Sequence, residues 1–204
     1  MSHPIYTYER DKASISYYDA NAQEYCNKSM HAESSNLYYP FLRCLSQGKH
    51  ILDAGCGCGR DTKHFLSLGY QVTAIDASEA MVKFSSELTG QKNLQLDFRD
   101  LPFKETFDGI WSFASLLHIS KDEIDEVVYQ FTQALREEGV WYMSFKEGEG
   151  EQFDGSRLFN NYTKSSLKNL LTRHPVLNIM EIWYSSDCIG RSQQWVNALV
   201  RKRP

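Results

Sequence analysis

The feature that most constrains this chain is a set of three glycines at every second position, Gly55, Gly57 and Gly59, directly after an apolar segment that contains Asp53. A strand that feeds a glycine-rich turn and then a helix lets the backbone approach a nucleotide-like ligand closely, because no Cβ atom intervenes. The spacing discriminates between ligands. The third glycine of a dinucleotide fingerprint would fall on Arg60, and no Gly-Lys-Ser/Thr follows as in a phosphate-binding loop. The turn therefore predicts an α/β domain that binds neither a dinucleotide nor a nucleotide phosphate held by a phosphate-binding loop.

Further acids follow at the ends of the next predicted strands. Residues 71–76 form a β-rich run that ends in Asp76, and an acid at the tip of this second strand suits the two hydroxyls of a ribose. Residues 94–98 place Asp97 after a third strand, and residues 106–111 supply a fourth. Alternating strands and helices indicate a parallel sheet covered on both faces.

The Asp-x-Gly-x-Gly-x-Gly run, Asp76, Asp97 and the Leu-Pro-Phe at 101–103 followed by Phe-Asp at 107–108 resemble class I S-adenosylmethionine-dependent methyltransferases. The resemblance covers about residues 50–119. It implies S-adenosylmethionine as cofactor, S-adenosylhomocysteine as product, and a Rossmann-like three-layer α/β/α sandwich. Its sheet is mostly parallel and seven-stranded, with the last strand antiparallel; the short loop before the last predicted strand agrees with that.

The resemblance also implies roles for single residues. Asp53 and the glycine turn would meet the methionine moiety, directly or through water, Asp76 would hold the ribose, and Asp97 would accept from the adenine amino group. Phe98 would offer a backbone N–H, and the segment just past the fourth strand would lie near the sulfonium. The expected cofactor-binding residues are Tyr18, Tyr25, Asp53, Gly55, Gly57, Asp76, Ala77, Asp97, Phe98, Ala114 and Ser115.

The N-terminal segment carries a second resemblance. Residues 17–25 are similar to the Tyr-Asp-x-x-Ala-x-x-Tyr opening of many small methyltransferases, in which a helix lies across the cofactor as a lid. Tyr18 and Tyr25 are seven residues apart, on one face of a helix, and are expected to contact the cofactor carboxylate or cover the sulfonium. Packing of the helix onto the domain would explain the two rings equally well.

Methyl transfer needs mainly an aligned acceptor and the exclusion of water, and orientation alone supplies roughly 7–11 kcal/mol of barrier lowering. A base is needed only where the acceptor carries a proton. His118 is the candidate base, because it follows the fourth strand on the crevice side and titrates near neutrality; a structural role is the alternative. Arg157, Phe159, Tyr162 and Trp195 are candidates for the mouth of the acceptor pocket. Residues 146–151 are expected to be a solvated acidic run, and glutamates that face the site would favour an amine acceptor.

The remaining pattern predicts the flanking elements. Residues 16–47 are expected to be helical in two pieces, broken near 29–35 and stopped at Gly48, and Ser78 is expected to cap a helix to residue 88. Residues 120–123 predict a capping box, and Thr163 a further helix cap. Strands are expected over 140–145, 176–184 and 194–200. We expect one domain, 1–204, with an N-terminal helical lid (1–48), a cofactor-binding core (49–146) and a C-terminal part (147–204) that completes the sheet and pocket.

Composition narrows the function classes. The net charge of −4 gives no electrostatic reason to expect a nucleic-acid partner, and no stretch approaches the roughly 20 apolar residues of a membrane span. Five cysteines without a secretory signal predict reduced thiols in the cytoplasm, with Cys56 and Cys58 as small residues that fill the turn rather than metal ligands. The sequence thus favours methylation of a small molecule. The alternatives are a tRNA or protein methyltransferase, a non-catalytic cofactor-binding protein and, disfavoured by Arg60, a nicotinamide-dependent reductase. The oligomeric state is left open.

Overall fold

The computed structural model describes residues 4–46 and 49–204 of the chain, with side chains from residue 12 onward. The predicted helix stop at Gly48 lies outside these residues. In the described part the helices are α1 (Pro4–Ser29), α2 (Ser35–Leu42), α3 (Arg60–Ser67), α4 (Glu79–Thr89), α5 (Ile124–Ala134) and α6 (Lys164–Thr172), with 3-10 turns η1 (Phe98–Asp100) and η2 (Leu116–His118). The strands are β1 (His50–Ala54), β2 (Gln71–Asp76), β3 (Leu94–Gln95), β4 (Phe107–Ser112), β5 (Leu135–Lys146), β6 (Gly150–Phe153), β7 (Leu158–Asn161), β8 (Leu177–Ser186) and β9 (Gln194–Lys202).

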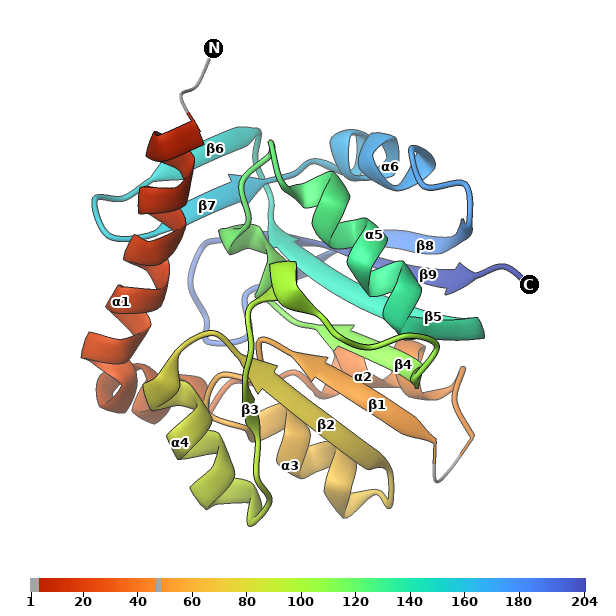
Figure 1. Cartoon of the computed structure of the whole chain (residues 1–204), viewed down its shortest axis with the longest axis horizontal. Helices are drawn as coiled ribbons and strands as arrows, with labels where there is room; N and C mark the ends of the chain where they lie inside the picture. Colours follow the sequence, from red (N-terminus) through yellow and green to blue (C-terminus); the bar gives the residue numbers. More distant parts are fainter. Residues whose placement is uncertain (1–3, 47–48) are drawn as a thin grey trace.

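Seven strands form one sheet in the order β3-β2-β1-β4-β5-β9-β8 (Figure 1). The pairs from β3 to β5 are parallel, whereas β9 pairs antiparallel with both β5 and β8. The predicted sheet with a reversed last strand is therefore confirmed. Strand β5 is longer than the expected 140–145, and Gly139, expected to precede it, lies within it.

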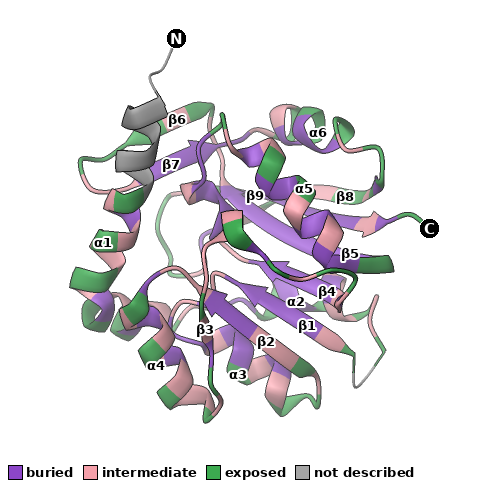
Figure 2. Cartoon of the chain, viewed as in Figure 1, coloured by how far each residue is buried: buried purple, intermediate pink, exposed green. Residues whose placement is uncertain are grey.

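Two apolar layers hold the helices to the sheet, whose central strands are buried (Figure 2). On one face, α5 and α6 pack through a stripe that includes Val128, Phe131 and Leu167. On the other, α2 and α3 pack through Phe41 and Phe65 against Trp111 of β4. Apolar side chains at helical spacing on each helix thus bury against opposite faces of the same strands, which gives the three-layer sandwich.

Of the local features predicted at the helix ends, two are confirmed and one is wrong. Ser78 caps α4 by accepting from the Met81 N–H, and Thr163 caps α6, both as predicted. The cap at Thr163 is a capping box with Ser166, which was not predicted. The capping box predicted at residues 120–123 is wrong, because α5 begins after Glu123 with no side-chain cap and the Ser120 hydroxyl donates to the Glu123 carboxylate. The hairpin β6–β7 forms a separate two-stranded sheet that the sequence pattern did not reveal.

Helix α1 lies across the carboxyl ends of the parallel strands (Figure 1). Asn21 departs from helical geometry and kinks it. A break at 30–34, close to the predicted one near 29–35, separates α1 from α2, which begins after Ser34. The described helix starts at Pro4, earlier than the expected residue 16. This position makes α1 the element that covers the site built at the strand ends.

Candidate active site

The glycine turn between β1 and α3 is shaped by close contacts that exclude side chains. A Cβ atom on Gly55 would lie 2.3 Å from the Ser115 Cβ, and one on Gly59 would lie 2.9 Å from the Ser85 backbone in α4. Both glycines also have positive φ, 78° and 86°, which other residues rarely adopt. The turn therefore packs tightly against Ser115 and Ser85, and its backbone carries no side chain at these two glycines.

Asp53 lies behind this turn rather than in front of it. Its carboxylate is 2% exposed and accepts a hydrogen bond of 2.5 Å from the Thr62 hydroxyl. Burial, together with the nearby Asp61 carboxylate, raises the pKa of Asp53. The side chain lines neither of the cavities described below, so direct contact with a ligand, one of the two routes expected for it, has no support in this arrangement.

Asp76 ends β2 with both carboxylate oxygens toward main-chain donors. One oxygen accepts from the Gly57 N–H and the other from the Ser78 N–H, each at 2.9 Å. Burial raises the pKa of Asp76 to about 6, although these N–H donors oppose the rise. Each oxygen keeps a further lone pair, so the carboxylate can accept from two ligand hydroxyls while it fixes the glycine turn.

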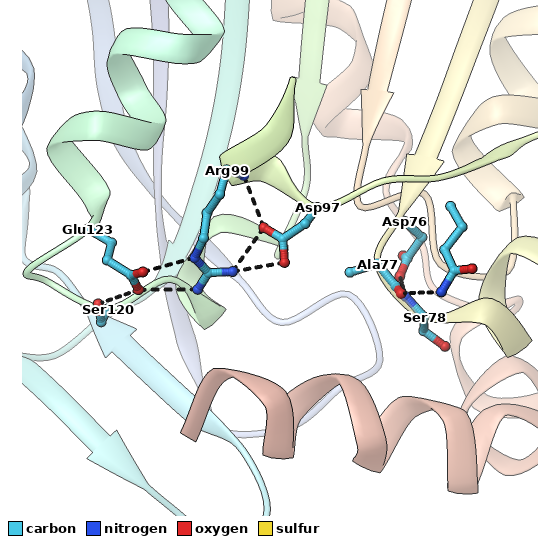
Figure 3. A network of polar contacts seen from close by, with 8 residues as sticks. Asp76, Ala77, Ser78, Asp97, Arg99, Ser120 and Glu123 are labelled. Atoms are coloured by element: carbon cyan, nitrogen blue, oxygen red, sulfur yellow. Dashed lines mark hydrogen bonds and ion pairs between the residues drawn. The ribbon is translucent and has the colours of Figure 1, made fainter. Parts of the chain in front are cut away.

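Asp97 belongs to a charged network that ties the third strand to α5 (Figure 3). Its carboxylate accepts from the Arg99 backbone N–H at 3.0 Å and from the Arg99 guanidinium at 2.9 Å. The same guanidinium donates to Glu123 at 3.0 and 3.2 Å, and Ser120 donates to Glu123 at 2.9 Å. The network holds Asp97 in place beside Phe98 at the edge of the crevice.

The end of β4 is fixed by hydrogen bonds to both neighbouring strands. Ala114 adopts a φ of 52°, rare for a residue with a Cβ, and its N–H donates to Ser144 of β5 at 2.8 Å. The Ser115 hydroxyl donates to the Ala54 carbonyl at 2.7 Å. The surrounding strands thus hold a strained backbone in place at the point where the crevice begins.

His118 and Tyr18 form a hydrogen-bonded pair between η2 and α1. The His118 Nδ1 lies 2.7 Å from the Leu158 carbonyl oxygen and must donate to it, which leaves Nε2 to accept from the Tyr18 hydroxyl at 2.9 Å. Burial lowers the pKa of His118 to about 4, and the neighbouring cations Arg157 and Lys146 lower it further. The imidazole is therefore neutral near pH 7, with its free nitrogen directed at Tyr18.

Helix α1 is anchored over the crevice by polar and covalent links. The Asp19 carboxylate accepts from the Ser78 hydroxyl and the Ala80 N–H, at 2.5 and 3.2 Å. Cys26 of α1 forms a disulfide with Cys58 of the glycine turn. The expectation that all five thiols are reduced is therefore wrong for this pair, because the fold places α1 against the glycine turn. Cys44, Cys56 and Cys188 are free.

Two adjoining cavities occupy the crevice between α1 and the strand ends, with volumes of about 110 and 310 Å³. The smaller one brings together all of the predicted site residues except Asp53. The residues that line both cavities, and so form the junction between them, are Tyr18, Tyr25, Gly55, Gly57, Phe113, Ala114 and His118.

The structure adds lining residues that sequence reasoning missed. In the smaller cavity, Ser14, Met81 and Arg99 stand beside the predicted residues. No motif marks these three residues. Helices α1 and α4 bring Ser14 and Met81 into place, and Arg99 lies between Asp97 and Asp100, which drew the attention in the sequence. In the larger cavity, Arg60 and Lys146 were visible in the sequence, but only the fold directs them to the same space.

The predicted mouth of the acceptor pocket is partly assembled. Arg157, Phe159 and Trp195 line the larger cavity, whereas Tyr162 is buried and its hydroxyl accepts from the Asn160 side-chain amide at 3.1 Å. The three glutamates of residues 146–151 line neither cavity, and one of them, Glu151, accepts from the Lys121 backbone N–H at 2.6 Å. Among the described side chains, those of residues 12–46 and 49–204, no three metal-ligating groups come together. None of the described helices has the length and apolar character that crossing a bilayer requires.

Comparison with known proteins gives this geometry a context. A family model described as a methyltransferase domain matches residues 51–139. An O-methyltransferase of Penicillium expansum, cnsE, is 37% identical over 100 residues, which cover 45% of this chain and 36% of that protein. The ubiquinone biosynthesis O-methyltransferase of Xanthomonas campestris is 31% identical over 111 residues, 50% of this chain and 45% of that protein. The chain thus spans less than half the length of these relatives.

Solved structures extend the likeness to the whole fold. The 1,6-didemethyltoxoflavin-N1-methyltransferase of Burkholderia thailandensis, solved with S-adenosylhomocysteine, superposes with a TM-score of 0.80 at 19% identity, covering 100% of this chain and 92% of that one. The [4+2]-cyclase SpnF gives a TM-score of 0.74 at 16% identity, covering 95% and 97%. These likenesses concern the fold, which hosts more than one activity. Residues 51–139 of the chain thus match a methyltransferase domain, and the whole chain shares the seven-stranded fold of a solved S-adenosylhomocysteine-bound methyltransferase.

Proposed function

We propose that the protein transfers a methyl group from S-adenosylmethionine to a small-molecule acceptor. The observation that carries this proposal is the pair of adjoining cavities, one beside Asp76 and Asp97 and the other beside Phe159 and Trp195, with a shared junction at His118. A methyl transfer needs two ligands that meet end to end, and the two cavities provide this arrangement. Named relatives act as O-methyltransferases, and a fold neighbour as an N-methyltransferase, which supports this class of reaction.

The residues of the smaller cavity fit the cofactor chemically. Asp76 offers two oxygens to the ribose hydroxyls, Asp97 offers its carboxylate to the adenine amino group, and Gly55 and Gly57 leave the backbone open beside the methionine moiety. When bound, the cofactor supplies a methyl group on a positively charged sulfur that is already activated for displacement. The aromatic ring of Tyr25, 5.1 Å from that of Tyr18, then covers the junction from the α1 side.

The chain's own contribution to the reaction is orientation and exclusion of water. The fixed backbone at Ala114 and the rings at the junction hold the acceptor in line with the sulfonium, and such alignment supplies roughly 7–11 kcal/mol. With the cofactor held by Asp76, Asp97 and the glycine turn, the acceptor's lone pair would take the methyl group, and the electron pair of the S–CH₃ bond would stay with the cofactor's sulfur. Where the acceptor is a hydroxyl, its proton passes to the Tyr18 oxygen as the Tyr18 proton moves to His118 Nε2, along the 2.9 Å hydrogen bond.

The direct test is calorimetric titration of the purified protein with S-adenosylmethionine, S-adenosylhomocysteine and NADH in parallel. We expect micromolar binding of both adenosyl ligands and none of NADH. Binding of NADH alone, or of none of the three, would contradict the proposal. Adenosyl binding without methyl transfer to any screened small molecule would favour a non-catalytic binding protein.

The location, partners and domain division stay predictions. A cytoplasmic location is expected from the sequence, but a retained Cys26–Cys58 disulfide favours a compartment that is not strongly reducing. The expected absence of a nucleic-acid partner rests on the net charge of −4. The division into a helical lid (1–48), core (49–146) and C-terminal part (147–204) is compatible with α1 over the crevice.

A further inference from the structure

The larger cavity is lined by more cations than acids: Lys28, Arg60, Lys146, Arg157 and Arg191 against Glu24, Asp61 and Asp187. Arg60 comes from the start of α3, Lys146 from the end of β5, Arg157 from just before β7, and Arg191 from the loop between β8 and β9. Three of these cations pair with an acid that lines the same cavity, and the first of these pairs is Lys28 with Glu24. Arg60 lies 2.6 Å from the Asp61 carboxylate. Arg191 lies 2.7 Å from that of Asp187. The remaining pair, Lys146 and Arg157, therefore dominates the charge that the cavity offers to a ligand.

Lys146 and Arg157 lie against the same aromatic ring. The Lys146 ammonium is 3.3 Å from the centroid of the Phe159 ring, and the Arg157 guanidinium is 5.0 Å from it. Within the described part of the chain, Lys146 has no carboxylate within 4.0 Å. Arg157 pairs with Asp154 at 2.9 Å through Nη2, but its buried Nε has no hydrogen-bond partner. Buried N–H donors are rarely left unpaired in folded proteins.

Burial and the repulsion between Lys146 and Arg157 destabilise the positive charge of Lys146. Burial and the Arg157 charge lower the pKa of Lys146 to about 8. Two cations that share one ring and repel each other are stabilised by an anion between them. The larger cavity thus has the electrostatics of an anion subsite, next to the junction at which the methyl group would be transferred.

Aromatic side chains give this subsite its shape. Phe113 and Trp195 stack at 6.3 Å between centroids with an interplanar angle of 21°, and both line the cavity together with Phe159. Such walls accept a flat ring. Lys146 and Arg157 lie beside these walls and close enough to the junction that, beyond the effect of burial, their charges lower the pKa of His118.

We infer that the methyl acceptor is a planar aromatic acid whose carboxylate binds Lys146 and Arg157, while its nucleophilic atom faces His118 at the junction. This inference rests on the proposed function and narrows its substrate class. It reverses the expectation that glutamates of residues 146–151, if they face the site, favour an amine, since the cations and not the glutamates line the cavity.

The experiment is a calorimetric comparison of three probes of matched shape in saturating S-adenosylhomocysteine: 4-hydroxybenzoate, 4-hydroxybenzamide and 4-hydroxybenzylamine. We expect the carboxylate to bind at least tenfold more tightly than the carboxamide and the amine to show no binding. Lys146→Gln should reduce the preference for the carboxylate at least fivefold. The matched control is Lys164→Gln, which removes an exposed lysine stacked on Tyr184 at 4.6 Å, outside the cavity, and should retain the preference.

A second measurement does not depend on any variant folding correctly. In wild-type protein labelled on lysine, NMR titration should show the pKa of Lys146 rising when 4-hydroxybenzoate is added and staying unchanged with 4-hydroxybenzamide. Equal affinities for the three probes, binding of none of them, or a Lys146 pKa insensitive to the carboxylate would overturn the inference.

Failure of the inference and failure of the proposed function give different results. S-adenosylhomocysteine is titrated first, without any probe. If it binds and the probes show no charge preference, the anion subsite is wrong and the proposed function stands. If it does not bind, the proposed function fails, and the probes titrated alone still decide whether the cations form an anion subsite.

Discussion

Four aspartates near the glycine turn carry the same functional group and play different parts. Asp53 and Asp61 face inward, and the Tyr38 hydroxyl and Trp111 indole donate to Asp61 at 2.6 and 2.8 Å. Burial opposes ionisation of Asp61, but the Arg60 guanidinium and these donors hold its pKa below its usual range. Asp76 and Asp97 face the smaller cavity instead. Only the second pair can meet a ligand of the smaller cavity, since Asp61 lines the larger cavity and Asp53 lines neither. Spacing in the sequence does not make this distinction.

Asp76→Ala should weaken binding of S-adenosylhomocysteine by about 1–3 kcal/mol, which corresponds to about 5- to 150-fold in Kd. The reason is that ligand hydroxyls would lose their acceptor and the Gly57 N–H would lose its partner. The measurement is calorimetric titration. Asp100→Ala, which removes an exposed acid of η1, is the control and should bind normally. Unchanged affinity in Asp76→Ala would contradict the placement of the ribose.

His118 should remain neutral from pH 8 down to about pH 5, because burial lowers its pKa to about 4. Nitrogen-detected NMR of the histidine rings should show a proton on Nδ1 and none on Nε2 throughout this range. A folded-state pKa below the ordinary value near 6.5 also means that the unfolded chain binds the proton first. The contribution of His118 to stability is therefore complete above pH 6.5 and is lost as the pH falls toward 4. An imidazole that titrates near pH 6.5 would contradict this assignment.

At the scale of elements, α1 is held by a few specific links. Asp19 contacts the start of α4, Tyr18 reaches His118, and the Ser14 hydroxyl accepts from the Leu158 N–H of β7 at 3.0 Å. The disulfide adds a covalent link from the helix to the glycine turn. Since α1 forms one wall of both cavities, its attachment and ligand binding should depend on each other.

Cys26→Ser should lower the free energy of unfolding by about 3–4 kcal/mol, since the disulfide closes a loop across 32 positions and restricts the unfolded chain. Urea unfolding with and without reductant measures the effect. The wild-type protein should lose a similar amount on reduction, whereas Cys26→Ser should not respond. Cys44→Ser, which changes a free thiol, is the control. A wild-type midpoint that is insensitive to reductant would show that this link does not stabilise the protein.

The elements that the sequence predicted well are those with a local signal. The strand before the glycine turn, the cap at Ser78 and the reversed last strand were predicted because apolar runs and turn residues mark them. The hairpin β6–β7 was not, because its strands are short and its turn lies in a polar stretch without alternation. The predicted cap at Ser120 failed because Arg99 draws Glu123 into an ion pair from a distant part of the chain. The same limit applies to the Cys26–Cys58 pairing, which only tertiary structure creates.

At the scale of the whole molecule, the two cavities differ in the charge they hold without a ligand. The smaller one contains Asp76, whose pKa burial raises to about 6, and the larger one contains Lys146, whose pKa burial lowers to about 8. Both shifts mean that the ionised side chain is less stable in the folded protein than in the unfolded chain. Near pH 7 both groups are largely ionised, so the two buried charges together lower the stability of the ligand-free protein. Ligands that pair with them should stabilise the fold as well as bind.

Lys146→Gln should therefore be more stable relative to the wild-type protein at pH 7 than at pH 10. Between the folded pKa of about 8 and the ordinary value near 10.4, the unfolded wild-type chain binds a proton that the folded protein releases, so wild-type stability rises with pH in this window. From pH 7 to pH 10, the free energy of unfolding of Lys146→Gln should fall relative to that of the wild-type protein by on the order of 1–2 kcal/mol, allowing for solvent screening of a half-buried ammonium. Urea unfolding at both pH values measures it, with Lys164→Gln as the variant whose difference stays constant. A constant difference for Lys146→Gln would mean that Lys146 is not destabilised in the ligand-free cavity, and the electrostatic argument for an acidic acceptor would lose its basis.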